Sequence, residues 1–170
     1  MPDNEALKNF VFDDAARLFE GVVTRANVMK GQFLSTGAVT IKENHVDMGI
    51  DYGVPASAKV TLTDWSKPDA DIMGDIQKMV AVAEGNGYVV NKAVTSLKMI
   101  NYMRNNTAMQ TAVLGATNKR LLTKQELVNL LMQEYGITID RCDENFNFRK
   151  ADGTLKTARY LKEGVFTLYE

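Results

Sequence analysis

Residues 36–71 decide the fold, and they read TGAVTIKENHVDMGIDYGVPASAKVTLTDWSKPDAD. Apolar and polar residues alternate over 38–43 and again over 46–51, which is the period of a half-buried strand. The pair Asn44-His45 separates the two runs, so this part of the stretch predicts a β-hairpin.

The second half of this stretch predicts one more strand and the start of a helix. Val60 and Leu62 alternate with polar residues over 58–63, which favours a third strand. The segment from Ser66 to Asp69 has the spacing of a capping box, with a proline in the first helical turn. Asp69, Asp71 and Asp75 suit the positive end of that helix, and Gly85-Asn86-Gly87 would end it.

A long helix is expected before the hairpin, over residues 4–34, ending at Thr36-Gly37 and with an interruption allowed near Asp13. Its apolar residues have a mean spacing of about 3.7, close to the 3.6 of a straight amphipathic helix. A coiled coil would keep about 3.5 and would need an apolar residue where Arg25 stands. We therefore expect this helix to lie across a sheet. The apolar positions are Val11, Ala15, Leu18, Val22, Ala26, Met29 and Phe33.

The rest of the chain alternates between short helices and short strands. A second capping box, from Thr123 to Glu126, opens a helix that Gly136 ends, and Asp152-Gly153 predicts a hairpin turn. The fold class is therefore α+β, with residues 1–63 as one long helix plus antiparallel strands and residues 64–170 as a compact α+β unit. The expected helices are 96–105, 107–114 and 123–135, and the expected strands are 88–94, 137–141, 145–149, 154–160 and 165–169.

Composition excludes several classes of protein. The 170 residues are 45% apolar and 24% charged, as in ordinary globular proteins, and the net charge of −1 argues against a nucleic-acid binder that relies on many phosphate contacts. No window approaches the roughly 20 apolar residues of a membrane span, and residues 1–8 are too polar for a signal peptide. The single cysteine, Cys142, cannot form an internal disulfide, which favours a reducing cytoplasm.

No combination of residues predicts catalysis or metal binding, so we expect no catalytic residue, cofactor or metal. The only histidine, His45, falls in the hairpin turn, and Cys142 follows a strand that looks buried. The run from Asp143 to Asn147 imitates the start of an EF-hand loop, but Phe148 stands where the loop needs glycine and Thr154 where it needs glutamate.

A few residues could instead contact other subunits. Trp65 is the only tryptophan, and it favours either core packing or an anchor between subunits. Lys119 and Arg120 give the loop 115–120 a basic tip, which is either solvated or makes contacts around a ring of subunits. Core filling or a re-packable contact surface would explain six methionines in predicted helices, namely Met73, Met79, Met99, Met103, Met109 and Met132.

Several short motifs follow the N-terminal helix in a fixed order. Together they resemble the lambda-like tailed-phage major capsid proteins, the phage capsid E family, over residues 13–170. The motifs are Asp51-Tyr-Gly-Val-Pro55, Trp65-Ser-Lys-Pro-Asp-Ala-Asp71, Asn101-Tyr-Met-Arg-Asn105, Leu122-Thr-Lys-Gln-Glu126, Tyr135-Gly-Ile-Thr-Ile139 and Leu161-Lys-Glu-Gly-Val-Phe-Thr-Leu168.

The resemblance implies the tailed-phage capsid fold, which encapsulins and the herpesvirus capsid floor share. Residues 1–63 would be the spine helix and hairpin of the peripheral domain, and residues 64–170 the axial domain. The resemblance further implies a non-enzymatic subunit that associates with copies of itself into pentamers and hexamers. Its partners would include a scaffold, a portal and a decoration protein, with DNA inside the shell. The subunit would reside in the virion, after assembly in the cytoplasm of the bacterial host.

One departure and two alternatives accompany this interpretation. The family's subunits are longer, with an N-terminal arm and an extended loop before the spine helix, so the chain is expected to be a truncated core. The first alternative is a subunit of an encapsulin-type compartment. The second is a small α+β ligand-binding module that uses residues 64–170.

Overall fold

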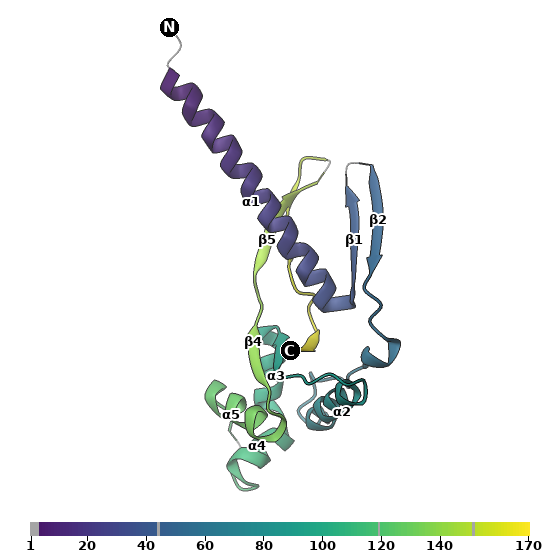
Figure 1. Ribbon diagram of the computed structural model, residues 1–170. Helices are drawn as coiled ribbons and strands as arrows, with labels where there is room; N and C mark the ends of the chain where they lie inside the picture. The colour runs from purple at the N-terminus through teal and green to yellow at the C-terminus, as the bar shows by residue number, and fades with distance from the viewer. Residues whose placement is uncertain (1–3, 44, 119, 151) are drawn as a thin grey trace.

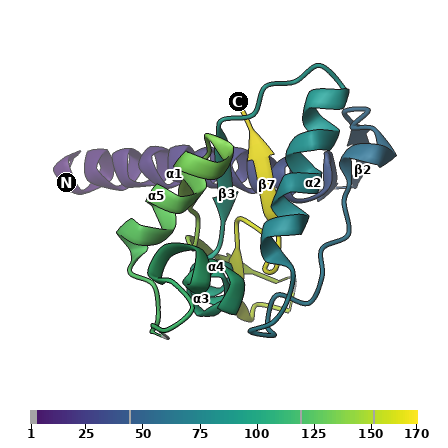
Figure 2. The ribbon, with the colours of Figure 1, turned by 90° about the horizontal axis from the view of Figure 1, so that it is seen from below.

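The structure is a computed structural model that describes residues 4–43, 45–118, 120–150 and 152–170. One long helix, α1 (Asn4–Thr36), runs out from the rest of the molecule, and two β-hairpins stand beside its C-terminal part (Figure 1). The remaining helices gather at the opposite end around a small sheet, as the view from below shows (Figure 2). The fold is therefore mixed α+β, as expected.

Helix α1 leads directly into the predicted hairpin. It is continuous over all 33 residues, so the interruption allowed near Asp13 does not occur. The N–H of Gly37 donates to the carbonyl of Phe33 at 2.7 Å, and its positive φ of 74° turns the chain into the first strand. Strands β1 (Ala38–Glu43) and β2 (Val46–Asp51) pair antiparallel, which confirms the hairpin.

The prediction of a third strand over 58–63 is wrong. A short 3-10 helix, η1 (Ala56–Ala58), includes the first residue of that range, and the residues after it belong to no strand. The polar groups of Thr63 bind a side chain instead, because its N–H and hydroxyl donate to Asp75 Oδ2 at 2.8 and 2.7 Å.

The next helix, α2 (Ile72–Gly85), begins later than the capping-box pattern predicted. Its N-cap is Asp71, whose Oδ1 accepts from the N–H of Gly74 at 3.0 Å. Ser66 does not cap a helix, since its hydroxyl donates to Asp64 Oδ1 at 2.6 Å. The predicted end at Gly85-Asn86-Gly87 is confirmed.

A three-stranded sheet has β3 (Lys92–Thr95) in its centre. Strand β4 (Thr138–Arg141) pairs parallel with β3, and β7 (Phe166–Tyr169) pairs antiparallel on its other side. The strand predicted over 88–94 corresponds to β3, which begins only at Lys92. It is shorter than predicted because β4 and β7 each offer only four residues for pairing.

Three helices form the crossover that a parallel β3–β4 pair requires, and sequence analysis predicted all of them: α3 (Leu97–Asn105), α4 (Thr107–Leu114) and α5 (Lys124–Tyr135). Each begins at a side-chain cap, from Ser96, Asn106 and Thr123 respectively. The capping box of α5 is complete, with Glu126 as its second member, and Gly136 ends the helix in the left-handed region.

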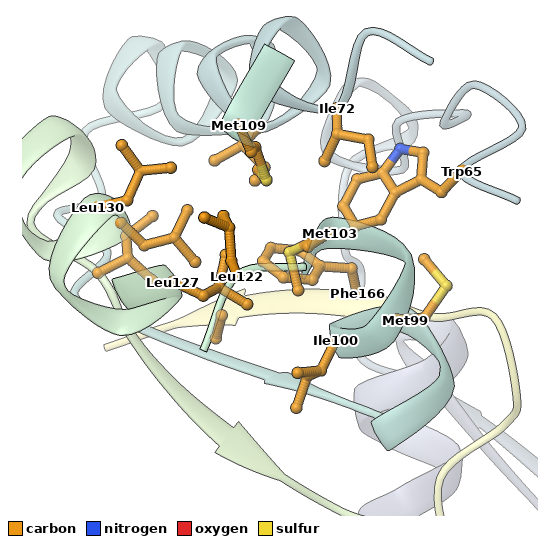
Figure 3. Packing of buried hydrophobic residues seen from close by; sticks show 14 residues of the cluster. Trp65, Ile72, Met99, Ile100, Met103, Met109, Leu122, Leu127, Leu130 and Phe166 are labelled. Carbon is orange, nitrogen blue, oxygen red and sulfur yellow. The ribbon is translucent and has the colours of Figure 1, made fainter. Parts of the chain in front are cut away.

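The hydrophobic core lies between these helices and the sheet (Figure 3). It includes three of the six helical methionines, whereas Met73 and Met79 lie at its edge and Met132 is exposed, so core filling explains only part of the set. The buried core residues are Trp65, Ile72, Ile76, Ala93, Met99, Ile100, Met103, Met109, Leu122, Leu127, Leu130, Leu131, Ile137 and Phe166.

Two buried polar side chains fix the turn that carries Trp65. The indole Nε1 of Trp65 donates to Asp75 Oδ2 at 2.8 Å, so that one carboxylate oxygen holds both Trp65 and Thr63. Asn106, which is fully buried, donates through Nδ2 to the carbonyls of Pro68 and Ala70 at 3.1 and 2.7 Å. The turn is therefore attached both to α2 and to the α3–α4 junction.

The second hairpin, β5 (Asn145–Arg149) with β6 (Leu155–Arg159), is also confirmed. Asp143 fixes its base, because this carboxylate accepts from Arg141, from Arg159 and from the N–H of Leu97 at the start of α3. Burial disfavours the charged form of Asp143, but these hydrogen bonds outweigh it and lower the pKa of the carboxyl.

The chain that follows β6 attaches α1 to the compact part. A Cβ added to Gly31 would overlap the carbonyl oxygen of Tyr160, so the two backbones pack directly against each other. Ser35 Oγ accepts from the N–H of Lys162 at 3.1 Å, and Thr167 Oγ1 donates to the carbonyl of Leu34 at 2.6 Å. Only the C-terminal part of α1 makes these contacts.

We predict that Gly31→Ala destabilises the protein by about 1–3 kcal/mol, because a methyl group forces apart two packed backbones. Gly21→Ala is the matched control, since nothing lies within 4 Å of its Cβ position. That variant should stabilise α1 by about 0.5–1 kcal/mol through helix propensity alone. Urea unfolding followed by circular dichroism measures both effects, and an equal gain in the two variants would contradict the close contact.

We predict that Asp75→Asn costs about 1–3 kcal/mol at neutral pH, because it leaves buried donors without their charged acceptor. Burial disfavours the charged form of Asp75, but hydrogen bonds from Trp65 and Thr63 outweigh it and lower the pKa of this carboxyl below its ordinary value. Its stabilising effect is therefore complete above the ordinary pKa and is lost as the pH falls through the folded-state value.

Stability in urea, followed by Trp65 fluorescence at neutral pH and at about pH 3, tests this linkage. The loss of stability on acidification should be smaller in Asp75→Asn than in the unmodified chain. Asp69→Asn is the control, because Asp69 is exposed, and it should change stability by less than about 0.5 kcal/mol. Equal pH dependence in all three proteins would show that Asp75 does not contribute.

Candidate subunit interface

The N-terminal part of α1 carries several large apolar side chains that are exposed. Every residue from 12 to 23 is exposed, including Phe12 at 72%, Phe19 at 70% and Leu18 at 67%. Sequence analysis expected the helix to lie across a sheet, and this is wrong for residues 12–23. The contacts of α1 with the rest of the chain begin nearer its C-terminal end, so this segment projects freely (Figure 1).

The exposed part of α1 is amphipathic. With 3.6 residues per turn, its charged side chains gather on one side of the helix and its apolar side chains on the other. Asp13, Asp14, Arg17 and Glu20 form the charged side. The apolar side, which we call the α1 stripe, consists of Phe12, Ala15, Ala16, Leu18, Phe19, Val22 and Val23. An exposed apolar surface of this kind is typical of a protein–protein contact.

The outer part of hairpin β5–β6, which we call the hairpin tip, is also exposed. It comprises residues 147–150 and 152–157, all of which face solvent. Phe148 and Leu155 are 40% and 66% exposed, on opposite faces of the hairpin because Phe148 pairs with Lys156 and Leu155 with Arg149. The tip thus combines apolar side chains with basic ones.

The loop before α5 carries one of the predicted contact residues. Arg120 forms a bidentate pair with Glu126, with Nη1–Oε2 and Nη2–Oε1 distances of 3.0 and 2.5 Å. Hydrogen bonds from Arg120, with help from the N–H of Thr123, lower the pKa of Glu126 to about 2. The charge of Arg120 is therefore neutralised within the chain, and Lys119 lies outside the described residues.

Trp65, the other predicted contact residue, lies in the core. It is 3% exposed, and its ring packs against Phe166 with 5.4 Å between ring centroids. This placement agrees with the core-packing interpretation. It leaves Trp65 almost no surface to offer a neighbouring subunit, so an anchor role at that position is not supported.

A groove of about 1120 Å³ separates the base of hairpin β1–β2 from the compact part. Its walls are mostly apolar and include Val54, Val60 and Leu168. Two of its charged residues, Lys98 and Glu163, pair with each other at 3.2 Å. Three further charged residues line the groove, namely Lys59, Asp64 and Glu170.

The residues considered for chemistry are dispersed. His45 lies in the hairpin turn with a φ of 65°, and the N–H of Cys142 donates to the carbonyl of Thr95 at 2.9 Å. Within the described ranges, no group of three or more histidine, cysteine or acidic side chains could hold a metal ion. None of the helices there has both the length and the apolar content of a membrane span.

Sequence reasoning missed the most exposed residues of the candidate interface. Phe12 and Phe19 were not among the expected apolar positions, because that set followed a neighbouring row of the same helix, through Val11 and Leu18. A seven-residue spacing of apolar residues that starts at Phe12 would have predicted both phenylalanines. The basic residues of the hairpin tip were visible in the sequence, but their exposure depends on where the hairpin stands.

Comparisons with known proteins agree with the fold. Residues 1–169 match the family model for phage major capsid protein E. A solved structure described as a prophage capsid protein from E. coli CFT073 is similar, with a TM-score of 0.55 and 14% sequence identity. The similarity covers 92% of this chain and 47% of that one, so this chain spans about half the length of its structural relative. A comparison with curated proteins finds no match.

The structural similarity concerns the fold alone, since the sequence identity is low. The family match is independent of it and extends over nearly every residue. Membership in a capsid protein family means a structural protein and not an enzyme. The chain belongs to the phage major capsid protein E family.

Proposed function

We propose that this chain is a structural subunit of an icosahedral phage or prophage capsid. Copies of it would associate into pentamers and hexamers that enclose DNA. The observation that carries the proposal is the family match over residues 1–169. The fold similarity to a prophage capsid protein supports it.

The two proposed domains follow one another along the chain. Residues 1–63 would supply the spine helix and hairpin of a peripheral domain, and residues 64–170 would supply an axial domain. The contact of Gly31 with Tyr160, and the hydrogen bond between Leu34 and Thr167, would hold the two parts at a fixed angle. A shell needs such rigidity, because the geometry of each subunit sets the closure of the assembly.

The exposed surfaces support self-association. The α1 stripe places two phenylalanines in water, and aromatic side chains are enriched at the centres of protein interfaces. Burying each ring removes about 150–250 Å² of surface from water, so a partner gains from covering the stripe.

The other proposed partners are a scaffold, a portal and a decoration protein. The chain would reside in the virion, after assembly in the bacterial cytoplasm. An encapsulin-type compartment is less well supported, because the matching family is named for a phage capsid protein.

Light scattering on a sizing column, with negative-stain images of the same fractions, tests this proposal over a range of concentrations. Five- or six-membered rings, or pieces of shell, are expected, and their proportion should rise with concentration. A strict monomer at every concentration would overturn the proposed self-association of this chain.

We further propose that Lys119 and Arg120 contact neighbouring subunits around the ring. The double variant Lys119→Ala/Arg120→Ala should then shift association to at least about tenfold higher concentration, in line with the loss of a contact residue. Association is read from the same light-scattering series.

Glu126→Gln is the matched control for the ring contact. It weakens the pair with Arg120 and the cap of α5 but keeps both cations of the loop. Association should therefore be retained in Glu126→Gln. A loss of association in Glu126→Gln as well would assign the effect of the double variant to the fold of the loop and contradict a ring contact.

A further inference from the structure

We propose that the α1 stripe of one copy binds the hairpin tip of a second copy. This inference rests on the proposed function, because it specifies one contact of a self-associating subunit. The proposed contact joins two exposed surfaces, and its partner is a second copy of this chain.

The helix side of the contact is apolar with acidic borders. Asp14 and Glu20 lie next to the two edges of the α1 stripe, and Asp13 lies beside Glu20. Arg17 is the only basic residue between positions 12 and 23. A partner for this surface must therefore bring apolar side chains for the stripe and positive charge for its borders.

The hairpin tip has this composition. Its basic residues are Arg149, Lys150 and Lys156, and its one acidic residue is Asp152. None of the three cations forms an ion pair with another residue that the structure describes. Phe148, which is 40% exposed, lies on the same face as Lys156 because the two residues pair. The tip is thus complementary to the stripe both in charge and in apolar surface.

Charge also argues against the simplest alternative, in which two copies pair through α1 itself. Only the N-terminal part of the helix is free, so two stripes would have to meet over residues 12–23 in both copies. That arrangement would bring the acidic borders of the two helices together, which is unfavourable. The basic hairpin tip removes this repulsion.

The contact cannot form within one chain. Helix α1 is a single uninterrupted helix without proline, so its free end cannot bend back toward the hairpin. The helix and the hairpin diverge toward their free ends (Figure 1). Residues 12–23 and the hairpin tip are both exposed in the same molecule, so a contact between these two surfaces joins two copies.

Disulfide cross-linking between two single-cysteine chains tests the contact, with Cys142→Ser in both backgrounds. One chain carries Ala16→Cys within the stripe, and the other carries Thr154→Cys at the hairpin tip, on the face of Lys150 and Lys156, with a size tag on one of them. Mild oxidation of the mixture should give the mixed dimer. Gly21→Cys is the matched control, because Gly21 lies on the charged side of the same exposed helix and should give little mixed product.

A charge exchange tests the electrostatic part independently of cysteine chemistry. Asp14→Lys/Glu20→Lys and Lys150→Glu/Lys156→Glu should each shift association to about tenfold higher concentration, as expected when attraction between the surfaces becomes repulsion. An equal mixture of the two variants should recover association. All four positions are exposed, so these variants should keep the fold, which circular dichroism verifies.

The outcomes separate this inference from the proposed function. A wild-type chain that stays monomeric overturns both. Rings or shell pieces that form equally well with the charge variants, or equal cross-linking by Gly21→Cys, overturn the contact while the capsid function stands. Cross-links from Ala16→Cys to a second helix, in place of the hairpin, also overturn it.

Discussion

The arrangement of the molecule depends on the direct packing of α1 against the backbone at Tyr160. Gly31 allows this approach because it has no side chain, and Ser35 and Leu34 add hydrogen bonds to Lys162 and Thr167. These contacts occupy only the last part of the helix. The rest of α1 is therefore held at one end, and its direction in space follows from a single anchoring region.

A second constraint acts inside the compact part. The turn around Trp65 has no regular secondary structure of its own, so its polar groups depend on Asp75 and Asn106. Each of these side chains satisfies several backbone or side-chain groups from distant parts of the chain. The turn thereby holds Trp65 in the core, while residues 66–69 stay exposed.

The sequence predicted features whose causes are local. Helix caps at Ser96, Asn106 and Thr123 act over three or four residues, and both hairpins have turn residues between alternating strands. The predictions that were wrong depended on distant partners. Residues 58–63 alternate like a strand, but Asp75 takes the polar groups of Thr63, and none of the strands that the structure describes pairs with these residues. Of the predicted contact residues, Arg120 has an internal partner and Trp65 is buried, whereas the exposure of Phe19 required knowing where α1 stops touching the chain.

The sheet has a consequence for synthesis on the ribosome. Strand β7 pairs with β3 across more than 70 residues of sequence, and its Phe166 completes the core beside Trp65. Long-range pairing of this kind must wait until both strands have left the exit tunnel. The helices between them acquire their caps earlier, but the core stays open until the segment around Phe166 emerges. A nascent chain therefore reaches its closed core late, which delays the appearance of a rigid subunit until nearly all of these residues have been translated.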